Sequence, residues 1–225
     1  MSEKTITLFS LTSQNVNQHV TAINRTMNAL RRPCERLIIS PQQPALPNDF
    51  RWENHPIFNN WQYPNSYNQF IFTNLADYIT TDFVITIHDD GYGRNPERWT
   101  DEFFSYDYIG APWPSEWDLG GNRVGNGGFS LRSIQLLELC RFVPNIDVNM
   151  PEDVSICRAH REFFEQHRCL FAPVELAIEF SIEYGLSEYP GRTGRDSFGF
   201  HGKHNLNSSF IPPGGRLLQQ THRTV

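Results

Sequence analysis

The stretch Asp82-Phe-Val-Ile-Thr-Ile-His-Asp-Asp-Gly91 predicts a buried strand that ends at a polar site. Residues 83–87 are mostly β-branched or aromatic, which is typical of a core strand, and the apolar run stops at His88. Ligands of open α/β sheets bind beyond the carboxyl ends of the strands, so we expect His88, Asp89 and Asp90 at a crevice. An imidazole and two carboxylates there could hold a divalent cation. Asp-Asp-Gly is also ordinary turn chemistry, and this stretch alone does not separate the two interpretations.

The elements before this strand predict a doubly wound α/β fold. Residues 5–11 and 37–40 have the composition of strands, and apolar residues spaced by three and four from Val16 to Leu30 indicate an amphipathic helix between them. This order begins a mostly parallel central sheet with helices on both faces. Ser10 and Thr12, in the first strand-to-helix turn, are candidates for contact with a nucleotide. The turn has no Gly-x-Gly-x-x-Gly, which disfavours a Rossmann site, and Thr12 or Ser13 could instead cap the helix.

Length, charge and cysteine spacing narrow the class of protein. The 225 residues predict one α/β domain over residues 1–211, followed by a poorly ordered tail over residues 212–225. A net charge of -6 argues against a nucleic-acid partner. No stretch has the roughly 18 apolar residues of a membrane span, so we expect no integral membrane segment and a cytoplasmic protein. Four widely spaced cysteines predict free, mostly buried thiols.

A glycine-rich loop, Val124-Gly-Asn-Gly-Gly-Phe129, predicts a close backbone approach to another group. Glycine lacks the Cβ that would block such an approach. A sugar ring could lie against Asn126, Gly127 and Gly128, with the tryptophans of the neighbouring loop, Trp113 and Trp117, offering it apolar faces. The alternative is a glycine-rich turn with tryptophans in the core.

Two acidic residues, Glu152 and Asp153, begin a predicted helix that continues over residues 155–167. Acids in a first turn are favoured by the helix dipole, which is a structural role. A carboxylate at a helix start beside a crevice is also well held to act as a general base. Further along, His201 lies between aromatic residues and a glycine, and a histidine of this kind is usually a core or surface residue.

The order of these motifs resembles a little-characterised family of GT-A-type glycosyltransferases. The motifs are the apolar strand ending in His-Asp-Asp, Tyr108-Ile-Gly-Ala-Pro-Trp113, Gly125-Asn-Gly-Gly-Phe-Ser-Leu-Arg132, Pro151-Glu-Asp-Val154 and Phe198-Gly-Phe-His-Gly202. More distantly, the order is similar to the Fringe and core-1 β3-galactosyltransferase families. The resemblance implies that Asp90, the last acid of a D-x-D motif, and His201 hold Mn²⁺ or Mg²⁺. His88 takes the place of the first acid of that motif, and Asp89 its middle position.

The resemblance also implies a reaction. A sugar would move from a nucleotide-diphosphate donor to a hydroxyl of a glycan or lipid-linked acceptor, at a membrane only through that acceptor. Asp153 would be the base of an inverting displacement, with Glu152 as the alternative. Asp89, with Ser10 and Thr12, would contact the nucleotide. Two other hypotheses remain open: another divalent-metal enzyme, such as a nucleotidyltransferase or phosphohydrolase, and a GT-A-shaped binding module without activity.

Overall fold

A computed structural model describes residues 3–47, 49–117 and 120–206 of the chain. The predicted tail over residues 212–225 lies outside the described residues.

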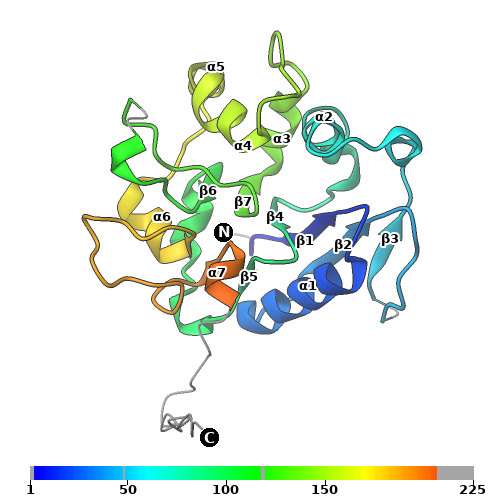
Figure 1. The fold of residues 1–225 in the computed structure, drawn as a ribbon, viewed down its shortest axis with the longest axis horizontal. Helices are drawn as coiled ribbons and strands as arrows, with labels where there is room; N and C mark the ends of the chain where they lie inside the picture. Colours follow the sequence, from blue (N-terminus) through cyan, green and yellow to red (C-terminus); the bar gives the residue numbers. More distant parts are fainter. Residues whose placement is uncertain (1–2, 48, 118–119, 207–225) are drawn as a thin grey trace, which may run out of the picture.

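The centre of the molecule is a six-stranded mixed sheet with the strand order β3-β2-β1-β4-β7-β6 (Figure 1). Its strands are β1 (Ile6–Leu11), β2 (Glu35–Ile39), β3 (Arg51–Glu53), β4 (Phe83–Ile87), β6 (Tyr108–Gly110) and β7 (Phe129–Ser133). The pairs β1–β2, β1–β4 and β2–β3 are parallel, whereas β7 is antiparallel to both of its neighbours. The predicted mostly parallel sheet is therefore confirmed, with one reversed strand beside β4.

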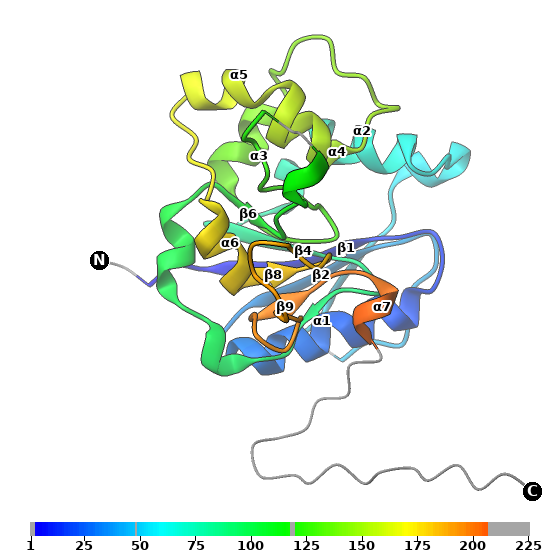
Figure 2. The same ribbon diagram turned by 60° about the vertical axis from the view of Figure 1, so that its left-hand side comes forward.

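Helices cover both faces of this sheet, as predicted (Figure 2). Helix α1 lies on one face and α2 and α3 on the other (Figures 1 and 2). The α-helices are α1 (Val16–Leu30), α2 (Asn65–Thr73), α3 (Ile134–Cys140), α4 (Glu152–Val154), α5 (Arg161–Gln166), α6 (Val174–Phe180) and α7 (Lys203–Leu206). Short 3₁₀ turns span Pro56–Asn60, Leu75–Tyr78, Pro96–Arg98, Asp101–Ser105 and Ser115–Trp117.

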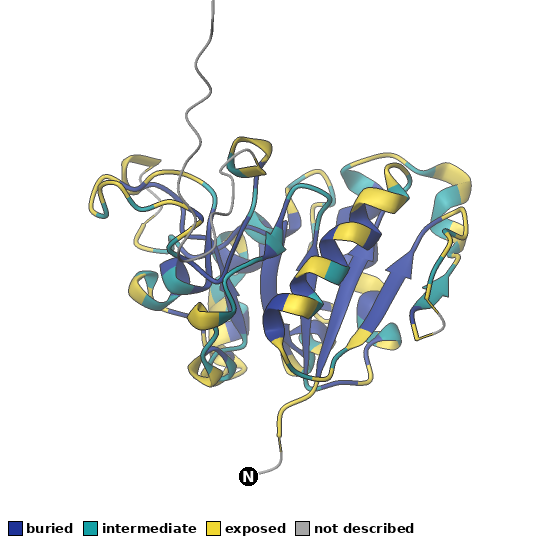
Figure 3. Cartoon of the chain, turned by 90° about the horizontal axis from the view of Figure 1, so that it is seen from below, coloured by how far each residue is buried: buried dark blue, intermediate teal, exposed yellow. Residues whose placement is uncertain are grey.

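Alternation along the strands divides the core into two layers. Ile6 and Leu8 of β1 face the layer that contains α1, whereas Phe9 and Leu11 face the layer that contains α2 and α3. Successive strand side chains point to opposite faces, so every central strand supplies both layers and is buried throughout (Figure 3). The stripe of apolar residues in α1 packs on the first of these layers, beside Ile6 and Leu8, with Val20 and Ile23 buried.

Two helix predictions differ from the structure. The residue at the N-terminus of α1 is Asn15, in a left-handed conformation and without a side-chain cap, so Thr12 and Ser13 do not cap it. The Thr12 hydroxyl instead accepts a hydrogen bond from the Gln14 amide at 3.1 Å within the turn. The helix predicted over residues 155–167 is divided into α4, a π-helical turn over Ser155–Ala159, and α5.

A second, small sheet with the order β5-β9-β8 was not predicted. It joins β5 (Tyr92–Gly93), β8 (Ser181–Ile182) and β9 (Gly199–Phe200). Because β5 is antiparallel to β9, the residues before β5 lie opposite those that follow β9. β8 is parallel to β9, so the residue after β8 reaches the same edge. This sheet therefore brings Asp90, Glu183 and His201 together from distant parts of the chain.

The cysteines agree with the sequence prediction. All four are free, and Cys140, Cys157 and Cys169 are buried. Across the described residues, none of the helices combines the length and hydropathy that a membrane crossing requires.

Candidate metal and catalytic site

His88, Asp90 and His201 form a cluster at the end of β4. One potential ligand atom from each residue lies within 4.8 Å of the other two. His201 Nε2 is 3.2 Å from Asp90 Oδ1, and the rings of His88 and His201 meet edge to face with centroids 5.4 Å apart. The amide of His88 donates to the Gly128 carbonyl at 2.9 Å, which ties the end of the strand to the glycine loop.

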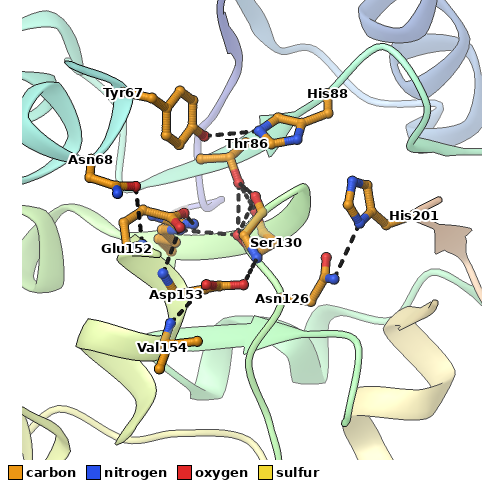
Figure 4. A network of polar contacts seen from close by, with 12 residues as sticks. Tyr67, Asn68, Thr86, His88, Asn126, Ser130, Glu152, Asp153, Val154 and His201 are labelled. Carbon is orange, nitrogen blue, oxygen red and sulfur yellow. Dashed lines mark hydrogen bonds and ion pairs between the residues drawn. The ribbon is translucent and has the colours of Figure 1, made fainter. Parts of the chain in front are cut away.

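The imidazole of His201 lies between two carboxylates. Its Nδ1 is 3.0 Å from Glu183 Oε1. The side-chain amide of Asn126 contacts Glu183, and it also contacts His201 (Figure 4). Burial alone would lower the pKa of His201, but hydrogen bonds to Asp90 and Glu183 and their charges outweigh it and raise the pKa to about 9. Likewise, His201 overcomes the effect of burial on Asp90 and lowers its pKa to about 2. The ring of His201 is thus fixed in orientation by a carboxylate on the side away from Asp90, as in many metal-binding histidines.

His88 is held as a neutral imidazole. Burial, together with the positive charge of His201, lowers the pKa of His88 to about 3. Its Nε2 lies 3.2 Å from the Tyr67 hydroxyl, and the two rings meet edge to face (Figure 4). A neutral imidazole has the free lone pair that a metal ligand needs.

The donor set of this cluster fits a divalent transition metal. Two imidazoles and one carboxylate suit Mn²⁺ or Zn²⁺ better than Mg²⁺, which prefers an all-oxygen environment. Coordination would replace the proton shared between His201 and Asp90, because a ligating histidine must be neutral. The residues therefore fit the predicted Mn²⁺ more closely than the predicted Mg²⁺.

The loop needs glycine at positions 127 and 128 because other side chains of the protein occupy the space that a β-carbon would fill. A β-carbon on Gly127 would lie 2.1 Å from Glu152 Oε1, and one on Gly128 would lie 2.1 Å from His201 Nε2. The close approach that the sequence predicts is confirmed, but the groups that approach are a carboxylate and an imidazole of the same chain. Contact of Asn126, Gly127 and Gly128 with a sugar stays a prediction; all three line the cavity described below.

Glu152 belongs to a buried polar layer. Its carboxylate accepts a hydrogen bond from Arg132 at 2.5 Å, and both side chains are almost fully buried. Strand alternation explains the arginine: Phe129 and Leu131 of β7 face the α1 layer, so Ser130 and Arg132 face the other side of the sheet. Thr86 of β4 shares a hydrogen bond with Ser130 at 2.7 Å (Figure 4). Glu152 thus balances a buried positive charge.

Asp153 has a different environment. Its carboxylate oxygens accept hydrogen bonds from the amides of Gly127 at 2.9 Å and Val154 at 2.8 Å (Figure 4). Burial and the charge of Glu152 raise the pKa of Asp153 to about 6 despite these bonds. A carboxylate with a raised pKa in a cavity is suited to accept a proton near neutral pH. Of the two acids, Asp153 has the properties of a base and Glu152 those of a structural partner.

Two adjoining cavities meet at this site. The first, of about 430 Å³, lies between the β1–α1 turn and the aromatic residues Trp61, Tyr63 and Tyr67. The second, of about 590 Å³, contains the metal-ligand cluster, the glycine loop and Asp153. Tyr63, Tyr67, His88 and Asp89 line both. The chain therefore forms two compartments connected through the end of β4.

The nucleotide and sugar candidates are distributed between these cavities. Thr12 lines the first cavity, and Asp89 lines both and accepts a hydrogen bond from Asn15 at 3.1 Å. Ser10 is not among the lining residues: its side chain is buried, and its hydroxyl donates to the Ile87 carbonyl. Trp113 lines the second cavity, but it is only 6% exposed because its indole covers Gly125.

Sequence reasoning missed three residues of the site. Glu183 lies in an ordinary polar stretch, and only the pairing of β8 with β9 brings it to His201. Arg132 could have been found, since alternation along Phe129–Ser133 predicts a charged side chain on a buried strand. Tyr67 contacts His88 from helix α2, and nothing in the sequence around Tyr67 distinguishes it from a core aromatic residue.

Comparisons with known proteins give a family but no curated relative. The model of the family described as "Protein of unknown function (DUF5672)" matches residues 51–201, which include all three members of the metal-ligand cluster, the glycine loop and Asp153. The chain belongs to the DUF5672 family. No curated protein matches its sequence.

Solved structures similar to this DUF5672 protein include two glycosyltransferases. One is the mannosyltransferase PcManGT from Pyrobaculum calidifontis in complex with GDP-Man and Mn²⁺, with a TM-score of 0.49 and 9% identity over 76% of this chain and 55% of that one. The other is the galactosyltransferase LgtC in complex with donor and acceptor sugar analogues, with a TM-score of 0.46 and 11% identity over 87% and 86% of the two chains. At these values neither likeness carries an activity over to this chain. Similarity to the Fringe and core-1 families is not among these findings and stays a prediction.

Proposed function

We propose that this DUF5672 protein is a metal-dependent glycosyltransferase, which transfers a sugar from a nucleotide-diphosphate donor to a hydroxyl of a glycan or lipid-linked acceptor. One observation carries the proposal: the potential metal ligands His88, Asp90 and His201 line the same cavity as Asp153, a carboxylate with a raised pKa. A transferase that activates a hydroxyl while it stabilises a leaving diphosphate needs both groups within one cavity.

In this proposal the three-residue cluster holds Mn²⁺. A bound divalent ion would neutralise the negative charge that develops on the leaving diphosphate. Glu183 orients His201 through Nδ1 and so keeps Nε2 directed toward Asp90. Lys203 also lines this cavity, and its ammonium group offers the diphosphate a positive charge in addition to that of the metal.

The first cavity supports a nucleotide site. Its aromatic residues Trp61 and Tyr63 offer faces on which a base can stack, and Thr12 and Asp89 offer polar contacts to the base or ribose. The diphosphate would then cross from this cavity to the second, past His88 and Asp89, which belong to both. Ser10 contributes by fixing the end of β4 through its hydrogen bond to Ile87.

Asp153 is the proposed base. It would accept the proton of the acceptor hydroxyl as that oxygen attacks the anomeric carbon, giving inversion. The amides of Gly127 and Val154 keep its carboxylate in place before and after this transfer. Glu152 is excluded from this role in the proposal, because its charge already balances buried Arg132.

Thermal-shift measurements with UDP-, GDP-, dTDP- and CMP-sugars, with and without Mn²⁺, test the proposal. A ligand that binds the folded state raises the unfolding temperature, and at about 100 times its Kd it adds roughly 2.7 kcal/mol of stability. We expect one nucleotide class to raise the unfolding temperature in the presence of Mn²⁺ and Asp90→Asn to abolish this effect. If no nucleotide sugar has an effect, the proposal is wrong.

A turnover assay separates the two alternative hypotheses. A nucleotidyltransferase or phosphohydrolase would turn over nucleoside triphosphates or phosphoesters without an acceptor sugar. A binding module without activity would bind a nucleotide sugar weakly or not at all and release no nucleotide, and Asp153→Asn would change nothing measurable. Chromatographic detection of released nucleotide, with and without added glycosides, therefore decides among all three.

A further inference from the structure

Two exposed aromatic side chains stand at the mouth of the second cavity. Trp117 is 47% exposed and Tyr184 is 36% exposed, and both line this cavity. Their rings meet at an interplanar angle of 60° with centroids 5.1 Å apart. Large aromatic side chains usually bury their faces. The ring of Tyr184 stacks on His204, with centroids 6.0 Å apart, yet both members of the pair keep exposed surface beside a polar cavity, which requires an explanation.

The surroundings of this pair are polar. Tyr184 directly follows Glu183, whose carboxylate contacts His201. Asp153, Asn126 and Lys203 line the same cavity as the aromatic pair. A pyranose ring has an apolar face of C–H groups and a rim of hydroxyls, so aromatic rings beside several hydrogen-bonding groups match it on both counts.

The position of the pair distinguishes it from the aromatic residues proposed for the nucleotide. Trp61 lines only the first cavity, together with the β1–α1 turn, and Tyr63 lines both cavities. Trp117 and Tyr184 line only the second cavity, which contains Asp153. A sugar that stacks on them would therefore be on the side of the proposed base.

Trp113, the other loop tryptophan that the sequence predicts beside a sugar, is only 6% exposed. Its indole packs on Gly125, where a β-carbon would lie 2.0 Å from the ring, and its backbone amide donates to the Arg123 carbonyl at 2.7 Å. Trp113 is thus held in place by the loop itself. Of the two tryptophans that line the second cavity, Trp117 is the one available to a ligand.

We infer that Trp117 and Tyr184 form a stacking platform for a pyranose ring of the acceptor. The inference deepens the proposed function and depends on it, since only a transferase has a sugar acceptor. Because the two aromatic rings are inclined at 60°, the sugar would stack its C–H face on one ring, contact the other at its edge, and direct one hydroxyl toward Asp153. The acceptor class is therefore a glycoside, so a lipid-linked acceptor would be recognised through its sugar.

Saturation-transfer difference NMR on the full chain tests this inference. The probes are the methyl α- and β-glycosides of glucose, galactose, mannose and N-acetylglucosamine, with their β-linked disaccharides, each measured without donor. We expect at least one probe to receive saturation, mainly at the C–H protons of one ring face. Trp117→Ala and Tyr184→Ala should each weaken its binding about tenfold, as expected for a lost aromatic contact, and Trp117→Phe should retain most of it.

The control is Phe142→Ala, because Phe142 is 71% exposed and lines neither cavity. This variant should bind the probe as the unmodified protein does. The inference is overturned if no probe receives saturation, or if binding survives in the Trp117→Ala/Tyr184→Ala double variant. Thermal shifts by the nucleotide sugars, measured on the same variants, show separately whether the donor site is intact. Failure of the platform with an intact donor site contradicts the inference alone, whereas loss of every nucleotide effect contradicts the proposed function.

Discussion

Gly128 packs directly against His201: a β-carbon on Gly128 would lie 2.1 Å from Nε2 of the imidazole. That nitrogen is the one that faces Asp90, at 3.2 Å. The glycine loop and the metal-ligand cluster are therefore one packed unit, and the identity of residue 128 controls where the histidine lies. This relationship gives the first of five predictions.

Gly128→Ala should displace His201 and disable the metal-ligand cluster. The added methyl group overpacks the site, which typically costs about 1–3 kcal/mol of unfolding free energy. We expect the variant to fold, with a lower unfolding temperature and no rise on addition of Mn²⁺. Gly185→Ala is the matched control, since a β-carbon there meets nothing within 4 Å. An unchanged Mn²⁺ response in Gly128→Ala would contradict the prediction.

The metal preference follows from the two imidazoles. Mn²⁺ and Zn²⁺ should bind at least about tenfold more tightly than Mg²⁺, because nitrogen ligands favour transition metals. His88→Ala should remove most of this preference, as measured by isothermal titration calorimetry with each metal alone. His167→Ala, an exposed histidine outside both cavities, is the control. Equal affinities of the unmodified protein for Mn²⁺ and Mg²⁺ would refute this assignment.

Asp153→Asn should abolish transfer while it leaves the donor site intact. Removal of a general base typically lowers the rate by about 10²–10⁴-fold. The unfolding-temperature rise caused by the nucleotide sugar and Mn²⁺ should persist, because Asp153 is not one of the proposed ligands. Glu162→Gln on the exposed face of α5 provides the control. A variant that keeps the full transfer rate would show that another group accepts the proton.

The pH dependence of transfer should report the ionisation of Asp153. The pKa of this residue is raised to about 6 by burial and by the charge of Glu152. A base must be deprotonated, so kcat/KM at saturating Mn²⁺ should be constant above about pH 7 and fall as the pH drops through 6. Any residual rate of Asp153→Asn should lack this step. A profile of the unmodified protein that stays flat down to pH 5 would be inconsistent with Asp153 as the base.

Glu152→Ala should destabilise the fold strongly. It leaves Arg132 buried without a countercharge, and loss of one partner of a buried pair typically costs about 3–5 kcal/mol. Urea denaturation measures the change. The control is Glu165→Ala, which breaks the partly exposed pair of Arg161 and Glu165 in α5 and should cost less than about 0.5 kcal/mol. Similar losses in both variants would mean that Arg132 is stabilised by other groups.

The sequence by itself determined the central strands of the sheet and the position of the site at the end of β4, but not the short edge strand β3 or the reversed direction of β7. Strands and amphipathic helices are recognised from the spacing of apolar residues within a short stretch of chain. For this reason β1, α1, β2 and β4 could be predicted from the sequence. His88, Asp89 and Asp90 lie at the end of β4 for the same reason: they interrupt an apolar run that must be buried.

Only the tertiary structure decided what these groups touch. The rotation of the short helix α4 turned Glu152 toward buried Arg132 and Asp153 toward the Gly127 amide, and a sequence does not specify such a rotation. The pairing of β8 with β9 brought Glu183 to His201 across 18 residues, and packing filled the space above Gly127 and Gly128 with protein groups. These contacts join residues far apart in the chain, so they depend on how whole elements pack and not on local preference.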